Sequence, residues 1–69
     1  MRVTFDDGVD CAVVAGWKVR ELIAVTGGRA IWSARRHGWM VTKRCARDVV
    51  AAAERDGRPV VLTEGGGRP

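Results

Sequence analysis

Positively charged side chains are concentrated in one stretch of this sequence. Between Leu22 and Arg47 there is no aspartate or glutamate, and this window carries a formal charge of +6. The rest of the 69-residue chain sums to −2, so the window accounts for the net charge of +4. Guanidinium and ammonium groups neutralise phosphates and release counterions, which is typical of nucleic-acid-binding surfaces. The candidate phosphate contacts are Arg29, Arg35, Arg36, His37, Lys43, Arg44 and Arg47.

Two tryptophans lie among these cations. Trp32 and Trp39 belong to the apolar runs 29–33 and 38–42, and the four residues between the runs predict a hairpin loop. Adjacent arginines in such a loop could clamp a phosphate, although charged loops are usually only solvated. Indole rings can stack on unpaired bases, so Trp39 joins the candidate nucleic-acid contacts.

The faces of this hairpin follow from its register. If Ser33 faces Gly38, then Trp32 and Trp39 project from one face of the sheet, whereas Ile31 and Met40 project from the other. Both faces are therefore apolar at this hairpin, and the helices must cover one of them. The other is a binding surface or an oligomer contact, so Trp32 and Met40 are candidate stacking or interface residues. The tryptophans could instead fill the core of so small a domain. The sequence leaves open which face of the hairpin is buried.

Catalytic and metal-binding constellations find little support. His37 is the only histidine, there is no tyrosine, and Ser33 with His37 is the only nearby nucleophile and base. Cys11 and Cys45 lack the spacing of a zinc site or a disulfide framework, so two reduced thiols are expected. Asp6, Asp7 and Asp10 form a turn with solvated carboxylates rather than a calcium loop. We expect no enzyme, no metal and no cofactor.

The elements that must position the basic window can be read from the pattern of residues. Two β-rich runs, 2–5 and 9–14, flank Asp6-Asp7-Gly8 and predict an N-terminal hairpin. From Trp17 the apolar spacing becomes helical and ends at Gly27-Gly28, with Trp17 itself capping the edge of the core. A second helix begins after Thr42 as N-cap and ends at Asp56-Gly57.

The C-terminal part completes the predicted fold. Residues 59–62 read as a last strand entered through Pro59, which has no backbone N–H to donate and therefore fits either an edge strand or the start of a strand. The order ββ-α-ββ-α-β predicts an α+β fold, a small mostly antiparallel sheet with two helices packed on one face. We expect a single domain over residues 1–63 and a flexible glycine-rich tail over residues 64–69.

Composition favours a small folded protein of the cytoplasm. The chain is 46% hydrophobic and 29% charged, which is typical of globular domains. Its first residues do not form an export signal, and no apolar run approaches the roughly 20 residues of a membrane-spanning helix. The many arginines, alanines, valines and glycines suggest a bacterial genome of high GC content or one of its phages as the source.

Two resemblances follow from these residues. The pattern Trp32-Ser33-x-x-Arg36-x-Gly38-Trp39-x-Val41 resembles one in small uncharacterised proteins of actinobacteria and their phages. A helix followed by two short strands, with a tryptophan ending a basic hairpin, is similar to the HARP domain of annealing helicases, which binds fork DNA. That resemblance implies that Arg35, Arg36, Trp39 and Lys43 contact DNA.

These observations lead to two hypotheses of different classes. The first is a small non-enzymatic nucleic-acid-binding accessory or regulatory protein, more suited to DNA than RNA, that contacts phosphates through the basic hairpin and the start of the second helix. The alternative is a protein-interaction module or inhibitor, either as a single chain or as a homodimer, that uses the Trp/Met sheet face. Steep dependence on salt would distinguish a phosphate-binding surface from an apolar interface. Neither hypothesis involves a membrane.

Overall fold

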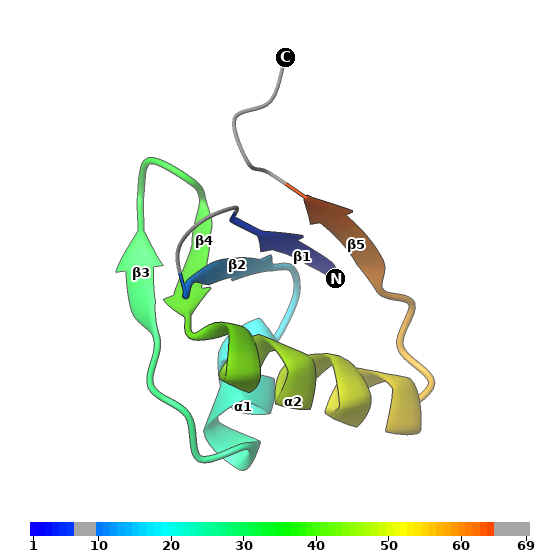
Figure 1. Ribbon diagram of the computed structural model, residues 1–69. Coiled ribbons are helices and arrows are strands. Elements are labelled where there is room, and N and C mark those ends of the chain that lie inside the picture. The colour runs from blue at the N-terminus through cyan, green and yellow to red at the C-terminus, as the bar shows by residue number, and fades with distance from the viewer. Residues whose placement is uncertain (7–9, 65–69) are drawn as a thin grey trace.

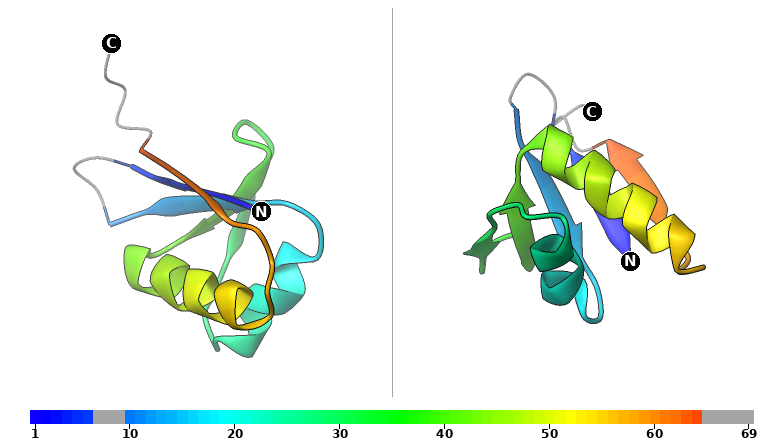
Figure 2. Two further views of the ribbon diagram at one scale, coloured as in Figure 1. Left: turned by 90° about the vertical axis from the view of Figure 1, so that its right-hand side faces the viewer. Right: turned by 90° about the horizontal axis from the view of Figure 1, so that it is seen from below.

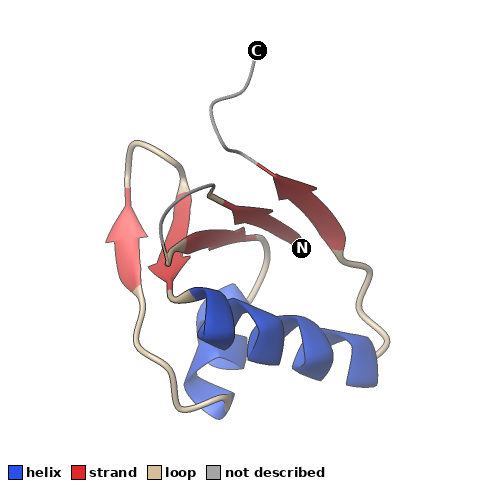
Figure 3. Ribbon diagram, in the orientation of Figure 1, coloured by secondary structure: helices blue, strands red, loops and turns tan. Residues whose placement is uncertain are grey.

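Two helices cover one face of a five-stranded sheet in the computed structural model, which describes residues 1–6 and 10–64 (Figures 1 and 3). This arrangement confirms the predicted α+β fold with a mostly antiparallel sheet. The elements are β1 (Arg2–Phe5), β2 (Ala12–Ala15), α1 (Val19–Val25), β3 (Ile31–Ser33), β4 (Gly38–Val41), α2 (Lys43–Arg55) and β5 (Val61–Glu64).

The strands lie in the order β3-β4-β2-β1-β5, so β3 and β5 form the two edges of the sheet. All neighbouring pairs are antiparallel except β1 and β5, which are parallel. Helix α2 carries the chain from β4 across the helical face to β5, beyond β2 and β1 (Figure 2). The β3–β4 hairpin is inclined to β1 and β2, and its tip lies beyond them on the side away from the helices (Figure 2, left). The last strand, β5, lies at an edge of the sheet, which is one of the two alternatives that Pro59 allowed.

The core lies between the sheet and the helices. Val3, Val14, Val19 and Val49 are the largest side chains that are completely buried there. Val3 and Val14 come from central strands, Val19 from α1 and Val49 from α2, so both helices contribute to one cluster. Full burial of an aliphatic side chain contributes roughly 1.5–3 kcal/mol. The core of this small domain therefore depends on valines and alanines, and few large side chains are needed to fill it.

Helix α2 has the capped start and apolar stripe that its sequence predicts. The hydroxyl oxygen of Thr42 accepts a hydrogen bond from the backbone N–H of Cys45 at 3.1 Å, which satisfies one of the helix's unpaired donors. Its buried positions are Cys45, Ala46, Val49 and Ala53, at helical spacing. The helix ends at Asp56, and Gly57 follows with a φ of 75°. Both ends of the predicted second helix are confirmed.

The turn before α1 corrects one prediction. Trp17 was expected to cap the edge of the core, but its side chain is 76% exposed. The helix begins only at Val19, because Lys18 adopts a left-handed conformation with a φ of 57°. Trp17 thus lies in a turn, and its carbonyl accepts a hydrogen bond from the guanidinium of Arg58. The Nζ atom of Lys18 lies 4.7 Å from the centre of the Trp17 ring.

Several boundaries differ slightly from the prediction. The strand pairing of β1 with β2 confirms the N-terminal hairpin, while its turn over residues 7–9 lies outside the described residues. The last strand begins at Val61 rather than at Pro59, because its pairing with β1 starts opposite Arg2, and it extends to Glu64, a predicted tail residue, which pairs with Phe5. The predicted tail over residues 65–69 lies outside the described residues. None of the described helices is long and apolar enough to cross a membrane.

Candidate nucleic-acid interface

The β3–β4 hairpin has the predicted register, and this register decides which side chains face the helices. Ser33 pairs with Gly38, and Trp32 pairs with Trp39. Trp39 in turn pairs with Val14 of β2, which is completely buried beneath the helices. The tryptophans therefore project from the helix-covered face, and the face left open by the sequence is settled. Trp39 packs against the core as a partly buried side chain.

Three side chains form a cluster at the β3 end of this face. The rings of Trp32 and Trp39 meet edge to face, with their centres 5.3 Å apart. The guanidinium carbon of Arg20, on α1, lies 5.8 Å from the centre of the Trp39 ring, within the range of a cation–π interaction. Trp39 is held between the core and these two neighbours. Trp32, on the edge strand, remains 51% exposed.

Arg20 was not among the predicted site residues. Its exposed position in α1 identifies it only as a solvated arginine, and no local pattern connects it with a tryptophan 19 positions later. The contact arises because the fold brings Arg20 of α1 over the ring of Trp39 in β4. Only the path of α1 across the sheet could have revealed it.

The hairpin loop is shaped by hydrogen bonding and by an unusual backbone conformation. The hydroxyl oxygen of Ser33 accepts a hydrogen bond from the backbone N–H of Arg36 at 3.2 Å. His37 adopts a left-handed conformation with a φ of 53°, which closes the four-residue loop before Gly38. Both Ser33 and His37 thus have roles in the turn. Arg35 and His37 are exposed at its tip.

Arg36 differs from its neighbour Arg35 because it has an acidic partner. Its two terminal nitrogens donate hydrogen bonds to the two carboxylate oxygens of Asp6, at 3.0 and 3.1 Å. These hydrogen bonds are the main cause that holds the pKa of Asp6 below its usual value. Desolvation opposes them as the second-largest effect, and the positive charges of Arg36 and Lys43 lower the pKa further. The same partner raises the pKa of Arg36. The pair ties the hairpin tip to the end of β1, so Arg36 is not an unpaired phosphate contact in this structure.

The start of α2 lies at the opposite end of β4 from the hairpin tip, so the two basic segments form a stripe rather than one compact patch. The carboxylate of Asp10 accepts a hydrogen bond from the backbone N–H of Lys43 at 3.1 Å. Lys43 is half-buried, whereas Arg44 and Arg47 are exposed. Although the window 22–47 contains no acid, Asp6 and Asp10 thus contact residues of the window on either side of β4, at Arg36 and at Lys43. Arg44 and Arg47 thus have no acidic side chain in contact with them among the described residues, whereas Arg36 and the backbone of Lys43 do.

Arg29 joins this region through the packing of the preceding residue. Gly28 lies directly against the side chain of Cys45, and a Cβ atom at this position would collide with the sulfur. The hydroxyl of Thr26 also lies 3.7 Å from that sulfur. The loop before β3 is thereby fixed on the first turn of α2. Exposed Arg29 follows this contact in the sequence, and exposed Arg44 precedes Cys45.

Met40 lies on the other face of the sheet. It pairs with Val13 and with Ile31, both of which alternate away from the helices. Val13 is nevertheless only 5% exposed, because Gly38 allows β4 to approach it closely. Met40 is half-buried, and Ile31 on the edge is largely exposed. A single sheet face that carries both tryptophan and methionine, as the alternative hypothesis requires, does not occur in this register.

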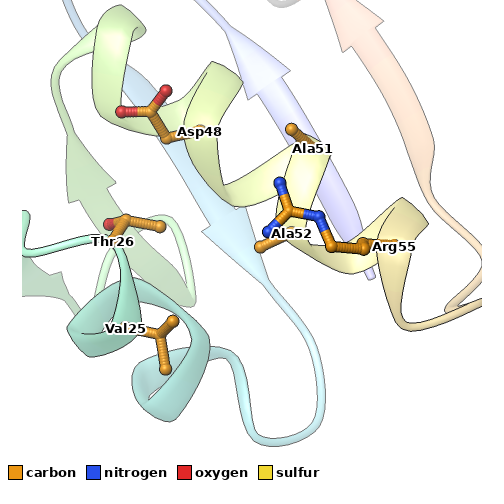
Figure 4. Close-up of a pocket in the computed structure, with 6 residues that line it drawn as sticks. All are labelled: Val25, Thr26, Asp48, Ala51, Ala52 and Arg55. Carbon is orange, nitrogen blue, oxygen red and sulfur yellow. The ribbon is translucent and has the colours of Figure 1, made fainter.

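A shallow groove of about 230 Å³ separates the C-terminal end of α1 from α2 (Figure 4). Val25 and Thr26 line it from α1, and the residues from α2 are Asp48, Ala51, Ala52 and Arg55. Within the described ranges, the chain holds no cluster of three metal-ligating side chains, and Asp7 of the acidic turn lies outside those ranges. The groove combines small side chains with one acid and one base, and it contains no predicted site residue.

Comparison with known proteins adds no relative: no family model matches the sequence, and no curated protein or solved structure is significantly similar to it. The resemblances to the actinobacterial pattern and to the HARP domain therefore stay predictions. The function has to be argued from the chain's own side chains.

Proposed function

We propose that this protein binds nucleic acid without catalysing a reaction, as an accessory or regulatory protein, and that it contacts phosphates along a basic stripe. The stripe consists of the hairpin tip, the loop before β3 and the first turns of α2. DNA is preferred over RNA on the resemblance to the HARP domain alone.

One observation supports this proposal above the others. In the part of the chain that the structure describes, the only ion pair joins Arg36 to Asp6. Arg29, Arg35, Arg44 and Arg47 are exposed and have no carboxylate within ion-pairing distance among those residues. Exposed arginines without acidic partners attract polyanions strongly, because binding phosphate costs them no existing ion pair.

The test is an electrophoretic shift of single-stranded and double-stranded DNA at about 50 and 200 mM salt. We expect binding that weakens steeply as salt rises. Replacing both Arg44 and Arg47 by alanine should lower the slope of log affinity against log salt by about 1.4–1.8, since each lost phosphate contact removes about 0.7–0.9. The double variant should keep its resistance to urea, because both side chains are exposed.

The control removes the same charge elsewhere. Arg2 and Arg55 are also exposed, but they lie outside the stripe, on β1 and on the last turn of α2. Replacing both by alanine should leave the slope nearly unchanged. Equal losses in the two double variants would reduce the proposal to attraction by net charge. No shift of either DNA at the lower salt concentration would refute nucleic-acid binding.

A second candidate function is favoured by the β5 edge of the sheet. Val61 and Leu62 are 53% and 58% exposed on a strand that pairs on one side only. Open apolar edges can pair with another chain, so a homodimer or a protein-interaction module could use β5. Sedimentation of the wild type and of Leu62→Lys across a range of concentrations tests this. A mass that doubles in the wild type alone would favour this function, and two monomers would exclude the homodimer.

A further inference from the structure

Trp32 differs from the other two tryptophans because it is both exposed and supported by an aromatic neighbour. Half of its side chain is accessible, while its ring meets the Trp39 ring edge to face at 5.3 Å. Trp39 is itself fixed by the core and by the guanidinium of Arg20. The ring of Trp32 is therefore held in place before any ligand arrives. A preorganised ring loses less conformational entropy when something stacks on it.

The surroundings of Trp32 are positively charged. Arg29 and Arg35 lie three residues before and after it, so the α-carbon of each is within about 11 Å of that of Trp32 even along a fully extended chain. Both arginines are exposed, and Arg20 adds a third cation behind Trp39. A ring flanked by cations on an open edge matches the chemistry of a polynucleotide strand, in which bases alternate with phosphates along the chain.

We propose that Trp32 is a stacking platform for an unpaired base, and that the preferred ligand is single-stranded nucleic acid. Arg29 and Arg35 hold the phosphates on either side of the stacked base. In a duplex the faces of each base are covered by its neighbours, so a protein ring can reach them only where the strand is unpaired. This inference rests on the proposed phosphate binding and adds to it a contact with the base.

The experiment separates the base from the phosphate. Binding of the full chain is measured by fluorescence anisotropy to a labelled oligodeoxythymidylate of about 15 nucleotides, within the usual range of single-strand site sizes. The comparison ligands are an abasic phosphodiester strand of equal length, oligouridylate of equal length, and a duplex. The abasic strand retains the phosphates and lacks the bases, so any preference for oligothymidylate measures stacking.

We expect the wild type to bind oligothymidylate about 5- to 150-fold more tightly than the abasic strand, the factor that stacking of one base at ~1–3 kcal/mol gives. Trp32→Ala should abolish this preference and leave binding of the abasic strand unchanged. Trp32→Phe should restore part of it, since a smaller ring still stacks. Comparable binding of oligouridylate would extend the ligand class to RNA.

Trp17→Ala is the matched control. Trp17 is more exposed than Trp32, but it lies in the turn before α1, and the ammonium group of Lys18 lies over its ring. The preference for bases should survive this substitution. If wild type and Trp32→Ala bind both strands equally, the stacking inference is overturned while phosphate binding stands. If neither strand binds at low salt, the proposed function fails as well.

Discussion

The two edges of the sheet carry different chemistry. At β3 an exposed tryptophan lies next to a second tryptophan, and exposed arginines precede and follow the strand. At β5 the exposed side chains are Val61 and Leu62, and the residues from Asp48 onward carry more acids than bases. A modest net charge of +4 thus conceals a strongly basic window, residues 22–47, and a slightly acidic C-terminal part of the sequence. The difference teaches that net charge alone says little about where an anionic ligand would bind.

Two glycines next to the edge strands also differ in how tightly they are packed: Gly38 lies in β4 beside β3, and Gly57 lies in the turn before β5. This difference gives the largest expected effect. An alanine at Gly38 would place its Cβ atom 2.5 Å from a methyl group of Val13 and 3.1 Å from the carbonyl oxygen of Val14. Val13 is buried and β-branched, so it has little freedom to move. We expect Gly38→Ala to lower the free energy of unfolding by about 1–3 kcal/mol, as measured by urea titration.

The substitution to compare with it is Gly57→Asn, in the turn between α2 and β5. Gly57 has a φ of 75°, and no atom lies within 4 Å of the position of its absent Cβ. Asparagine adopts this conformation more readily than other side chains, so the cost should stay below about 1 kcal/mol. If Gly57→Asn is as unstable as Gly38→Ala, the close approach of β4 to β2 does not make Gly38 the more sensitive of the two glycines.

The parts of the fold that the sequence predicted depend on neighbours in the chain. Thr42 caps α2, and Trp32 faces Trp39, because capping and hairpin pairing involve residues within a few positions of each other. The prediction that Trp17 caps the edge of the core is wrong, because it considered the apolar character of Trp17 and not the backbone conformation of its neighbour. That character favours burial, but the left-handed Lys18 delays the start of the helix and leaves the ring in a turn.

The candidate site was predicted in composition but not in geometry. The cations and tryptophans could be named, since the acid-free window is visible in the sequence. The contact between Asp6 and Arg36 could not, because 30 residues separate them and only the order of the strands brings them together. The same holds for Arg20 and Trp39. Charge patterning in a sequence therefore overestimates the unpaired charge of a folded surface when acidic residues come from another hairpin.

Adding one lysine to either edge would sharpen the comparison. Ile31 and Val61 are exposed, lie on edge strands at opposite ends of the sheet and project away from the helices. We expect Ile31→Lys to steepen the salt dependence of DNA binding by about 0.7–0.9, the contribution of one more phosphate contact. Val61→Lys adds the same charge at the β5 edge and should leave the slope unchanged. Anisotropy titrations across a range of salt concentrations measure both, and equal gains would break the distinction between the edges.

The smallest expected effect concerns Asp6, the acid that forms an ion pair with the hairpin tip. Asp6→Asn removes the partner of Arg36, and at pH 7 it should lower the free energy of unfolding by about 0.2–1 kcal/mol, the usual range for exposed ion pairs. The pKa of Asp6 is lowered from 3.8 in the folded state, chiefly by the hydrogen bonds from Arg36. The folded state therefore binds this proton more weakly than the unfolded state does.

The stabilisation by Asp6 is consequently complete well above pH 3.8 and is lost as the pH falls through the lower, folded pKa. Urea titrations of wild type and Asp6→Asn should differ at pH 7 and converge in strong acid. Asp48→Asn is the control, because Asp48 is exposed and forms no ion pair within the described part of the chain. A gap between wild type and Asp6→Asn that persists unchanged in strong acid would mean that the asparagine disturbs the hairpin itself. Convergence, together with tighter DNA binding by Asp6→Asn, would show that Asp6 and phosphate compete for Arg36.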